Sequence, residues 1–291
     1  LVMTRVRPDD PTRPAPWLFF ELGQAEVPMG WVSPELLGQK ALVLRSFGNI
    51  DVGPFVTVTA PDQVGDRVEM RVAVQLTGEM GATLEVTERV SGARAAAFRA
   101  RLEALPERRW AQVLESGYVG VWLPGARLTS LAVNGMDDGG GELMLRYQLE
   151  HETLLQASGE GQVELRPFYL SRLDRQLAAL PTRSQPLRLA MGLTRQVEVT
   201  IGGKTPVAMP SGTESVYAGK SALGTPALSF GQTWKRDGDA IVMKRQVTLH
   251  PSVIEPDDYA AFAAACRAVD LAERLAPTFR RDAGAAKPRR K

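Results

Sequence analysis

Cysteine and histidine are almost absent from this sequence. Its 291 residues include one cysteine, Cys266, and two histidines, His151 and His250. One thiol cannot form an internal disulfide, and these three side chains cannot supply the Cys and His ligand sets of structural zinc sites. The sequence therefore predicts no disulfide within the chain, no metal site and no bound cofactor.

Long apolar runs and excess charge are also missing. No apolar stretch reaches the roughly 18 residues that a transmembrane helix needs. The 35 basic residues nearly balance the 33 acidic ones, which leaves a formal net charge of +2. A global field that attracts nucleic acid or lipid is thereby excluded, so we expect no transmembrane segment and no nucleic-acid partner.

The small basic excess is concentrated after the last predicted helix, at Arg280, Arg281, Lys287, Arg289, Arg290 and Lys291. Only Asp282 opposes these charges, and the remaining residues are mainly Ala, Gly and Pro. This composition predicts a disordered tail over residues 277–291. A solvated tail is the simpler interpretation, and an arm that binds an anionic polymer or membrane surface is the alternative.

What is present is enough apolar material, 44% of the residues, for two domains. We expect a mainly β, antiparallel, β-sandwich-like fold with a few packed helices, in two β-rich units of which the first is α+β. The predicted division is an irregular arm over 1–45, a β-rich unit with a helix near 93–115 over 46–180, an antiparallel unit closed by a C-terminal helix over 181–276, and the tail.

The clearest local pattern is an alternation of apolar and polar residues. It runs through Val68, Met70, Val72, Val74 and Leu76, and again through Ala82, Leu84 and Val86. Gly78 and Gly81 lie between the two runs, which predicts a β-hairpin with one face in a core. Further on, Phe98, Leu102 and Leu105 recur at helical spacing before Pro106, and strands are predicted at 128–133 and 143–149.

The C-terminal part reads as a hairpin followed by a helix. Residues 228–249 alternate around a turn at 235–239, except that Arg245 falls on the apolar face. We interpret Arg245 as the site of a bulge or of a frayed strand. The helix begins at Pro256 with two aspartates in its first turn, and its apolar stripe is Tyr259, Phe262, Cys266 and Val269.

Few side chains in the sequence are candidates for chemistry. Cys266 lies on an apolar helical stripe, where burial makes a thiol unreactive, so we interpret it as a core residue. His151 and His250 each lie near a strand end without a Ser or Asp at an informative spacing, which favours surface or loop-anchoring roles. Asp137 and Asp138 lack the ligand spacing of a calcium loop, and the run from Gly202 to Thr205 lacks the first glycine and the helix of a phosphate loop.

Two separated segments share a distinctive combination of residues. The first contains Leu18 to Glu21, Pro28 to Gly30 and Ala41 to Val43. The second contains Leu249, Ile254, Pro256, Tyr259, Phe262, Val269 and Asp270, with Met209, Pro210 and Gly212 before it. Together, and loosely over residues 17–275, they resemble the C-terminal region of transglutaminase-like exported bacterial proteins, which carry flanking β-rich domains of unknown function.

The resemblance implies a periplasmic or exported bacterial protein and makes residues 1–45 the remnant of a transglutaminase-like domain end. In that family the catalytic Cys and His precede the matched region, and the Asp falls where Leu18 to Leu22 lies. Glu21 stands there instead, as the one candidate for the third triad member, and its longer stem moves the carboxylate by about one methylene. The chain begins at Leu1 rather than Met, so we expect a fragment or a processed product.

We therefore expect a non-catalytic accessory or interaction region of such a protein, which binds a protein or cell-envelope partner. A surface groove or an exposed sheet edge would bind that partner. The alternative is part of a cysteine peptidase or transglutaminase-like enzyme whose Cys and His lie upstream of this chain, with Glu21 orienting the histidine.

Overall fold

A computed structural model gives the architecture of most of the chain. It describes residues 2–5, 17–20, 36, 39–47, 49–58, 65–137, 141–159, 161–189, 192–217 and 226–281. The predicted fold class is confirmed, because the structure is mainly β with mostly antiparallel sheets and few helices.

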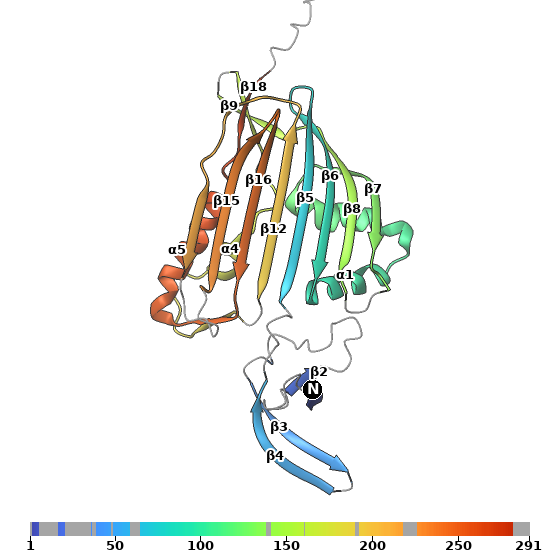
Figure 1. The fold of residues 1–291 in the computed structure, drawn as a ribbon, viewed down its shortest axis with the longest axis vertical. Coiled ribbons are helices and arrows are strands. Elements are labelled where there is room, and N and C mark those ends of the chain that lie inside the picture. The colour runs from blue at the N-terminus through green and yellow to red at the C-terminus, as the bar shows by residue number, and fades with distance from the viewer. Residues whose placement is uncertain are drawn as a thin grey trace, which may run out of the picture.

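One eight-stranded sheet dominates the structure, and Figure 1 shows it with the helices behind it. From edge to edge its strands are β14 (Thr213–Tyr217), β15 (Leu228–Asp237), β16 (Ala240–Leu249), β12 (Leu193–Gly202), β5 (Asp66–Thr77), β6 (Gly81–Ser91), β8 (Leu143–His151) and β7 (Arg127–Asn134). All neighbouring strands are antiparallel except β12 and β5, which pair in parallel at the centre.

Both hairpins predicted from alternation are confirmed. β5 and β6 pair without interruption from Arg67 opposite Ser91 to Thr77 opposite Gly81. Val68, Met70 and the later apolar residues of the pattern are buried, and the residues between them are exposed or half-buried. β15 and β16 form the second hairpin.

A second layer covers the inward face of the large sheet. Its helical elements are α1 (Ala93–Glu103), η2 (Glu107–Arg109), α2 (Trp110–Leu114), a π turn η3 (Glu115–Val119), α3 (Gly120–Trp122), α4 (Leu173–Leu177) and α5 (Pro256–Ala272). A small sheet is formed by β13 (Pro206–Ala208), β18 (Thr278–Arg280), β10 (Gln162–Leu165) and β9 (Leu155–Gly159). The helix predicted near 93–115 is therefore present, with Pro106 between α1 and η2.

Three two-stranded ladders complete the description. They are β11 (Leu187–Leu189) with β17 (Ser252–Ile254), β3 (Lys40–Phe47) with β4 (Asn49–Thr57), and β1 (Val2–Arg5) with β2 (Trp17–Phe20). The β3–β4 hairpin lies beyond one end of the large sheet (Figure 1). Part of the predicted irregular arm is thus paired strand.

Two hydrophobic clusters hold the layers together. The larger joins β5, β6, β8 and β12 to the small sheet, where Leu155, Val163 and Phe279 are buried, so the packing here is sheet on sheet. The smaller lies under α5 and contains its predicted stripe of Tyr259, Phe262, Cys266 and Val269. Within the described ranges, no helix has the length and apolar character that a bilayer crossing requires.

The two predicted units each supply one half of the large sheet. Residues 46–180 supply β5 to β8, residues 181–276 supply β12 and β14 to β16, and the parallel β5–β12 pair joins them into one sheet. A domain boundary at residue 181 stays a prediction. In the predicted disordered tail, Thr278–Arg280 instead forms β18, paired with β10 and β13, and residues 282–291 lie outside the described residues.

The predicted bulge or frayed strand at Arg245 is wrong. β16 keeps an unbroken register with both neighbours, so Arg245 pairs with Val197 and Gln232 and marks neither a bulge nor a frayed end. Its side chain stays on the inward face and is only 4% exposed. The burial is possible because Glu273, the residue that follows α5, lies opposite, with Oε1 at 3.5 Å from the Arg245 Nε.

The start of α1 is capped by a side chain from a distant strand. Gly92 precedes the helix and has no side chain to cap it, and the Arg94 N–H donates instead to Oδ1 of Asp66 at 3.0 Å. Burial raises the pKa of Asp66, and the backbone N–H groups of Arg94 and Ala93 oppose that rise. The first residue of β5 therefore fixes the helix that follows the hairpin.

We expect Asp66→Ala to lower the free energy of unfolding by about 1 kcal/mol, because two helix N–H groups lose their acceptor. Asp66→Asn keeps one acceptor oxygen and should lose less. Urea denaturation of both variants measures the difference, and Glu69→Ala on the same strand is the control. Equal stability of Asp66→Ala and the unmodified chain would contradict the capping role.

Candidate functional site

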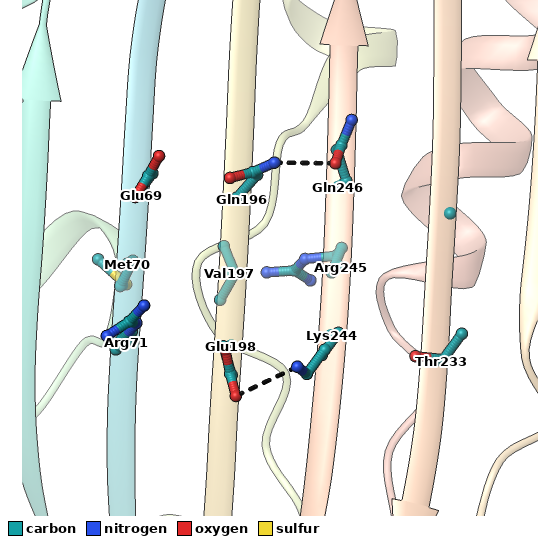
Figure 2. A pocket seen from close by; sticks show the side chains of 11 residues that line it. Glu69, Met70, Arg71, Gln196, Val197, Glu198, Thr233, Lys244, Arg245 and Gln246 are labelled. Carbon is teal, nitrogen blue, oxygen red and sulfur yellow. Dashed lines mark hydrogen bonds and ion pairs between the residues drawn. The ribbon is translucent and has the colours of Figure 1, made fainter.

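The outward face of the large sheet carries a shallow hollow of about 350 Å³ over β5, β12, β16 and β15. Figure 2 shows two pairs among its polar side chains: Lys244 Nζ lies 3.6 Å from Glu198 Oε1, and Gln196 Nε2 donates to Gln246 Oε1 at 3.0 Å. The lining contains neither Cys nor His. This hollow is a solvated sheet face rather than a place where reactive groups converge.

A larger hollow, of about 550 Å³, runs along β7 at the edge of the sheet. Residues 128–133 form one wall, and Glu107, Arg108, Trp110 and Ala111 of η2 and α2 form the other. We call this hollow the β7 groove. Half-buried Leu128, Leu131 and Val133 of β7 pack on the large core cluster and supply an apolar part of the groove lining, beside the charged Glu107 and Arg108.

β7 is an edge strand of the large sheet. Within the described residues its strand neighbour is β8 alone. Ser130 to Asn134 pairs regularly with β8, and residues 128–134 include no charged side chain. Unpaired edges are usually blunted by Lys, Pro or a covering segment, so this one is a ready template for another strand.

The other end of β7 is closed. Its register shifts between Leu128 and Ser130, which is a bulge, and the Leu128 N–H donates to Oε2 of Glu115 at 2.6 Å. Glu115 begins the π turn, a feature that is rare in proteins and frequent at functional sites. The open part of the edge is therefore Ser130 to Asn134.

Hydrogen bonds and ring packing hold the helical wall of the groove in place. Trp110 Nε1 donates to the carbonyl oxygens of Leu102 and Leu105 at 2.8 and 3.2 Å, which ties α2 to the end of α1. Tyr118 of the π turn packs edge to face on Phe98, with ring centroids 4.9 Å apart, and its hydroxyl donates to Glu88. A wall held in this way keeps the groove open in the absence of a ligand.

Glu88 is the centre of a buried polar cluster. It lies on the inward face of β6, is fully buried, and accepts hydrogen bonds from Tyr118, Tyr147 and Tyr169. The Tyr147 and Tyr169 hydroxyls lie 3.2 Å from its oxygens. Burial raises the pKa of Glu88, and the three hydroxyl donors oppose this rise.

Burial and the Glu88 carboxylate also raise the pKa of Tyr118 and Tyr147 well above the ordinary value, so these phenols stay protonated and act as donors. The cluster joins β6, β8, the π turn and the chain at Tyr169 in an interior that a substrate cannot reach. We assign it a structural role. Its sequence signal is a glutamate at an inward position of an alternating strand.

The pH dependence of stability should report on Glu88. Because its folded pKa is raised above the ordinary value of 4.5, the folded state holds this proton more tightly, and the resulting stabilisation is lost as pH rises through the raised pKa. The neutral amide of Glu88→Gln escapes that loss. Its free energy of unfolding, relative to the unmodified chain, should therefore increase as pH rises from 4.5 toward neutrality.

Urea denaturation over that pH range provides the measurement. Glu85→Gln, at an exposed position of the same strand, controls for the loss of a carboxylate. A difference between Glu88→Gln and the unmodified chain that does not change with pH would show that this carboxyl is not perturbed by burial.

A second buried cluster fixes the loop between β10 and α4. Glu273 accepts from the backbone N–H and the hydroxyl of Ser171 at 2.6 and 2.8 Å, and Arg245 donates to the Tyr169 carbonyl at 2.8 Å. Arg195 of β12 donates to the Ser171 hydroxyl at 3.2 Å and lies 5.2 Å from the centre of the Tyr169 ring. Tyr169 adopts a left-handed backbone, with φ of 55°, which these contacts stabilise.

Asp270 of α5 caps α4 in the same manner as Asp66 caps α1. Its two oxygens accept the N–H groups of Leu173 and Asp174 at 2.8 and 3.0 Å. Burial and the neighbouring Asp174 carboxyl raise the pKa of Asp270 to about 6. Both carboxyl oxygens of Asp270 are therefore engaged in hydrogen bonds within the fold.

The structure does not bring the predicted candidates for chemistry together. Cys266 is buried within α5, where burial and Asp270 raise its pKa to about 12, and it is a core residue as the sequence predicts. His151 lies at the end of β8, where Nδ1 accepts the Thr153 N–H at 3.1 Å and Nε2 contacts the Pro124 carbonyl at 3.0 Å. His151 thus anchors a loop, also as predicted.

The remaining candidates lie apart from one another. His250 follows β16, and its backbone N–H donates to the Ala227 carbonyl at 2.9 Å. Asp137 is exposed in the turn after β7, whereas Asp138 and Glu21 lie outside the described residues. Gly202 to Thr205 is a turn that leads into β13 rather than into a helix. Among described residues, no group of three Cys, His, Asp or Glu side chains is arranged to hold a metal ion.

Cys266 should be unreactive in the folded protein. Its thiolate is scarce at neutral pH because its pKa is raised to about 12, and its side chain is fully buried. We expect a thiol-specific disulfide reagent to modify Cys266 only after urea unfolding, at a rate that tracks the unfolded fraction. Rapid modification under native conditions would contradict the core assignment.

Comparison with known proteins identifies one part of the chain. Residues 161–275 match a family described as a domain of unknown function with a solved structure, DUF3858. No curated protein and no solved structure matches the chain. The predicted domain of unknown function is confirmed for this region, which contains the segment from Leu249 to Asp270 that carries the resemblance. The β7 groove lies before the matched region.

Proposed function

We propose that this chain is a non-catalytic interaction region that binds an extended segment of a protein along β7. The observation that carries the proposal is the uncharged edge of Ser130 to Asn134 beside the β7 groove. The proposed setting is an accessory region of a transglutaminase-like exported bacterial protein. Support for that setting comes from the resemblance of the two segments described above.

Strand addition fits the two surfaces that β7 offers. An incoming strand gains main-chain hydrogen bonds from the edge, which supply affinity without requiring a particular sequence. Every second side chain of that strand then points into the groove, where Leu131 and Val133 offer apolar surface and the opposite wall is formed by Glu107, Arg108, Trp110 and Ala111. The preferred ligand is therefore an extended segment with apolar residues at alternate positions.

The opposite edge of the sheet is less suitable. β14 carries Glu214 within its five residues, and α5 packs against it. The Tyr217 hydroxyl donates to the Asp258 carbonyl of α5 at 3.1 Å, which fixes the helix beside this edge. A charged and partly covered edge disfavours strand addition.

We propose binding without a covalent step because the polar side chains that could react are already bonded inside the fold. Glu88, Glu273 and Asp270 bind hydroxyl, guanidinium or backbone N–H groups inside the protein. Cys266 and His151 lie in different parts of the fold and serve packing and loop anchoring. The enzymatic alternative depends on Glu21 and on residues upstream of the chain, and no observation on the described residues favours it.

Binding should be lost when a charge is placed in the groove. Ala111 is exposed on α2 and lines the groove, and Glu is a good helix former, so Ala111→Glu should fold normally. A peptide that fills the groove would have to desolvate the new carboxylate, and we expect its affinity to fall by about tenfold or more. Gln112→Glu adds the same charge at an exposed neighbouring position that does not line the groove.

A phage-displayed library of random dodecapeptides provides the ligand, and fluorescence anisotropy of the selected peptides measures affinity. The proposal predicts peptides with alternating apolar residues that bind the unmodified chain and Gln112→Glu equally and Ala111→Glu weakly. Failure to select any peptide, or equal binding by all three proteins, would rule out the β7 groove as the binding site.

A further inference from the structure

We infer that a hollow between α4 and the end of α5 binds the phosphate group of a ligand through Arg172, Arg175 and Arg274. This hollow measures about 450 Å³, and we call it the arginine hollow. It shares no lining residue with the β7 groove, so the inference goes beyond the proposed strand-binding function and stands or falls separately from it.

The lining of the arginine hollow combines charged and apolar residues. It consists of three exposed arginines, two aspartates and two half-buried apolar residues, namely Arg172, Arg175, Arg274, Asp174, Asp270, Pro167 and Leu170. Neither lysine nor histidine takes part. The cationic groups of the hollow are therefore all guanidinium groups, which stay charged at every ordinary pH.

The carboxylates of the hollow already have partners within the fold. Asp270 accepts the N–H groups of Leu173 and Asp174, and Asp174 Oδ1 accepts the Arg175 N–H at 2.7 Å. These backbone donors compete with the arginines for the carboxylate oxygens. The acidic residues of the hollow thus leave the guanidinium groups without a close acceptor among their oxygens.

The arginines keep most of their donors available. Within the part of the chain that the structure describes, the guanidinium groups of Arg175 and Arg274 form no hydrogen bond and no ion pair. Arg172 uses one donor, because its Nη2 donates to the Val121 carbonyl at 3.2 Å. A guanidinium group carries five N–H donors, so each arginine can bind the oxygens of a ligand.

Positive charge exceeds negative charge around the hollow. The hydrogen bond with Asp270 lowers the pKa of Asp174, and the charges of Arg274 and Arg267 lower it further. Arg267 is thus a fourth arginine that acts on the same place. Four arginines against two aspartates leave an excess of 4 − 2 = 2 positive charges.

Hydrogen bonds hold the segment that carries Arg172 in place. Glu273 accepts the Ser171 N–H at 2.6 Å, and Asp270 accepts the Leu173 N–H at 2.8 Å, so both neighbours of Arg172 are fixed. Arg172 itself has a left-handed backbone, with φ of 53°, which few residues other than glycine adopt. A frame fixed in this way reduces the entropy lost when a ligand binds.

The lining favours a phosphate group over a carboxylate. Guanidinium groups bind both through paired N–H···O contacts. A carboxylate offers two oxygens, whereas a phosphate monoester offers three acceptor oxygens and about two negative charges at neutral pH. Three arginines and an excess of two charges match the phosphate. Pro167 and Leu170 give apolar surface for the organic part of the ligand.

Isothermal titration calorimetry with inorganic phosphate tests the site. We expect Arg175→Gln and Arg274→Gln each to weaken binding by about tenfold or more, because each removes charged hydrogen bonds to the ligand. The two residues are exposed and lie on separate elements, so each variant should fold normally. Arg188→Gln is the matched control, because Arg188 is exposed on β11 and does not line the hollow.

A second probe distinguishes a soluble phosphate ester from a lipid headgroup. Co-sedimentation measures binding to vesicles of equal parts phosphatidylglycerol and phosphatidylcholine, with phosphatidylcholine vesicles as the reference. The basic residues near the C-terminus are identical in all variants, so a difference from Arg188→Gln reports on the hollow.

The two probes together decide the inference. Phosphate binding that both hollow variants weaken and Arg188→Gln retains supports a soluble phosphate ligand, and the same pattern with vesicles supports a lipid headgroup. Absence of binding to both probes, or hollow variants that bind as well as Arg188→Gln does, overturns the inference. Either result leaves peptide binding at the β7 groove to its own test.

Discussion

The parallel pairing of β5 with β12 is the constraint on which the rest of the structure depends. Each half of the large sheet is a set of four antiparallel strands that begins at the centre and grows outward, β5-β6-β8-β7 on one side and β12-β16-β15-β14 on the other. The central ladder extends over ten residue pairs, from Leu193 opposite Asp66 to Gly202 opposite Gln75. It makes one inward face from two halves, and it leaves β7 and β14 as the edges.

Buried polar groups connect the two halves on that inward face. Tyr169 is the link, because its hydroxyl donates to Glu88 of β6 and its carbonyl accepts from Arg245 of β16. Removing a single partner would leave a buried charge or carbonyl without a hydrogen-bond partner. This lowers the free energy of unfolding by more than an ordinary core substitution does. These clusters therefore specify how the halves fit together, whereas the apolar residues supply most of the stabilisation.

Local periodicity was sufficient to predict the hairpins and α5, because both patterns lie within one stretch of sequence. The partners of the buried charges could not be found in this way. Asp66 accepts the N–H of Arg94 across 28 residues, and Asp270 binds the N–H of Leu173 across 97 residues. Arg245 was noticed as a violation of the apolar face, but only the packing of α5 reveals Glu273 as its partner.

The sequence predicted that an exposed sheet edge could bind a partner, but it did not indicate which strand forms that edge. An exposed sheet edge follows from any open antiparallel sheet, yet the order β6-β8-β7 inverts the chain order of the last two strands, so the sequence does not indicate that β7 rather than β8 is outermost. The π turn that carries Glu115 and Tyr118 has no periodic signal, since it interrupts helical spacing. Both features depend on tertiary packing.

The composition of β7 supports a role as a binding edge. Two other edge strands of this fold carry a charge or a proline, since β14 has Glu214 and β13 begins at Pro206. β7 has neither over residues 128–134, although an exposed uncharged edge promotes uncontrolled pairing. The bulge and Glu115 restrict the open edge to Ser130 to Asn134, which is long enough to pair with one strand and too short to template an extended sheet. An edge limited in this way favours a single, defined partner over aggregation.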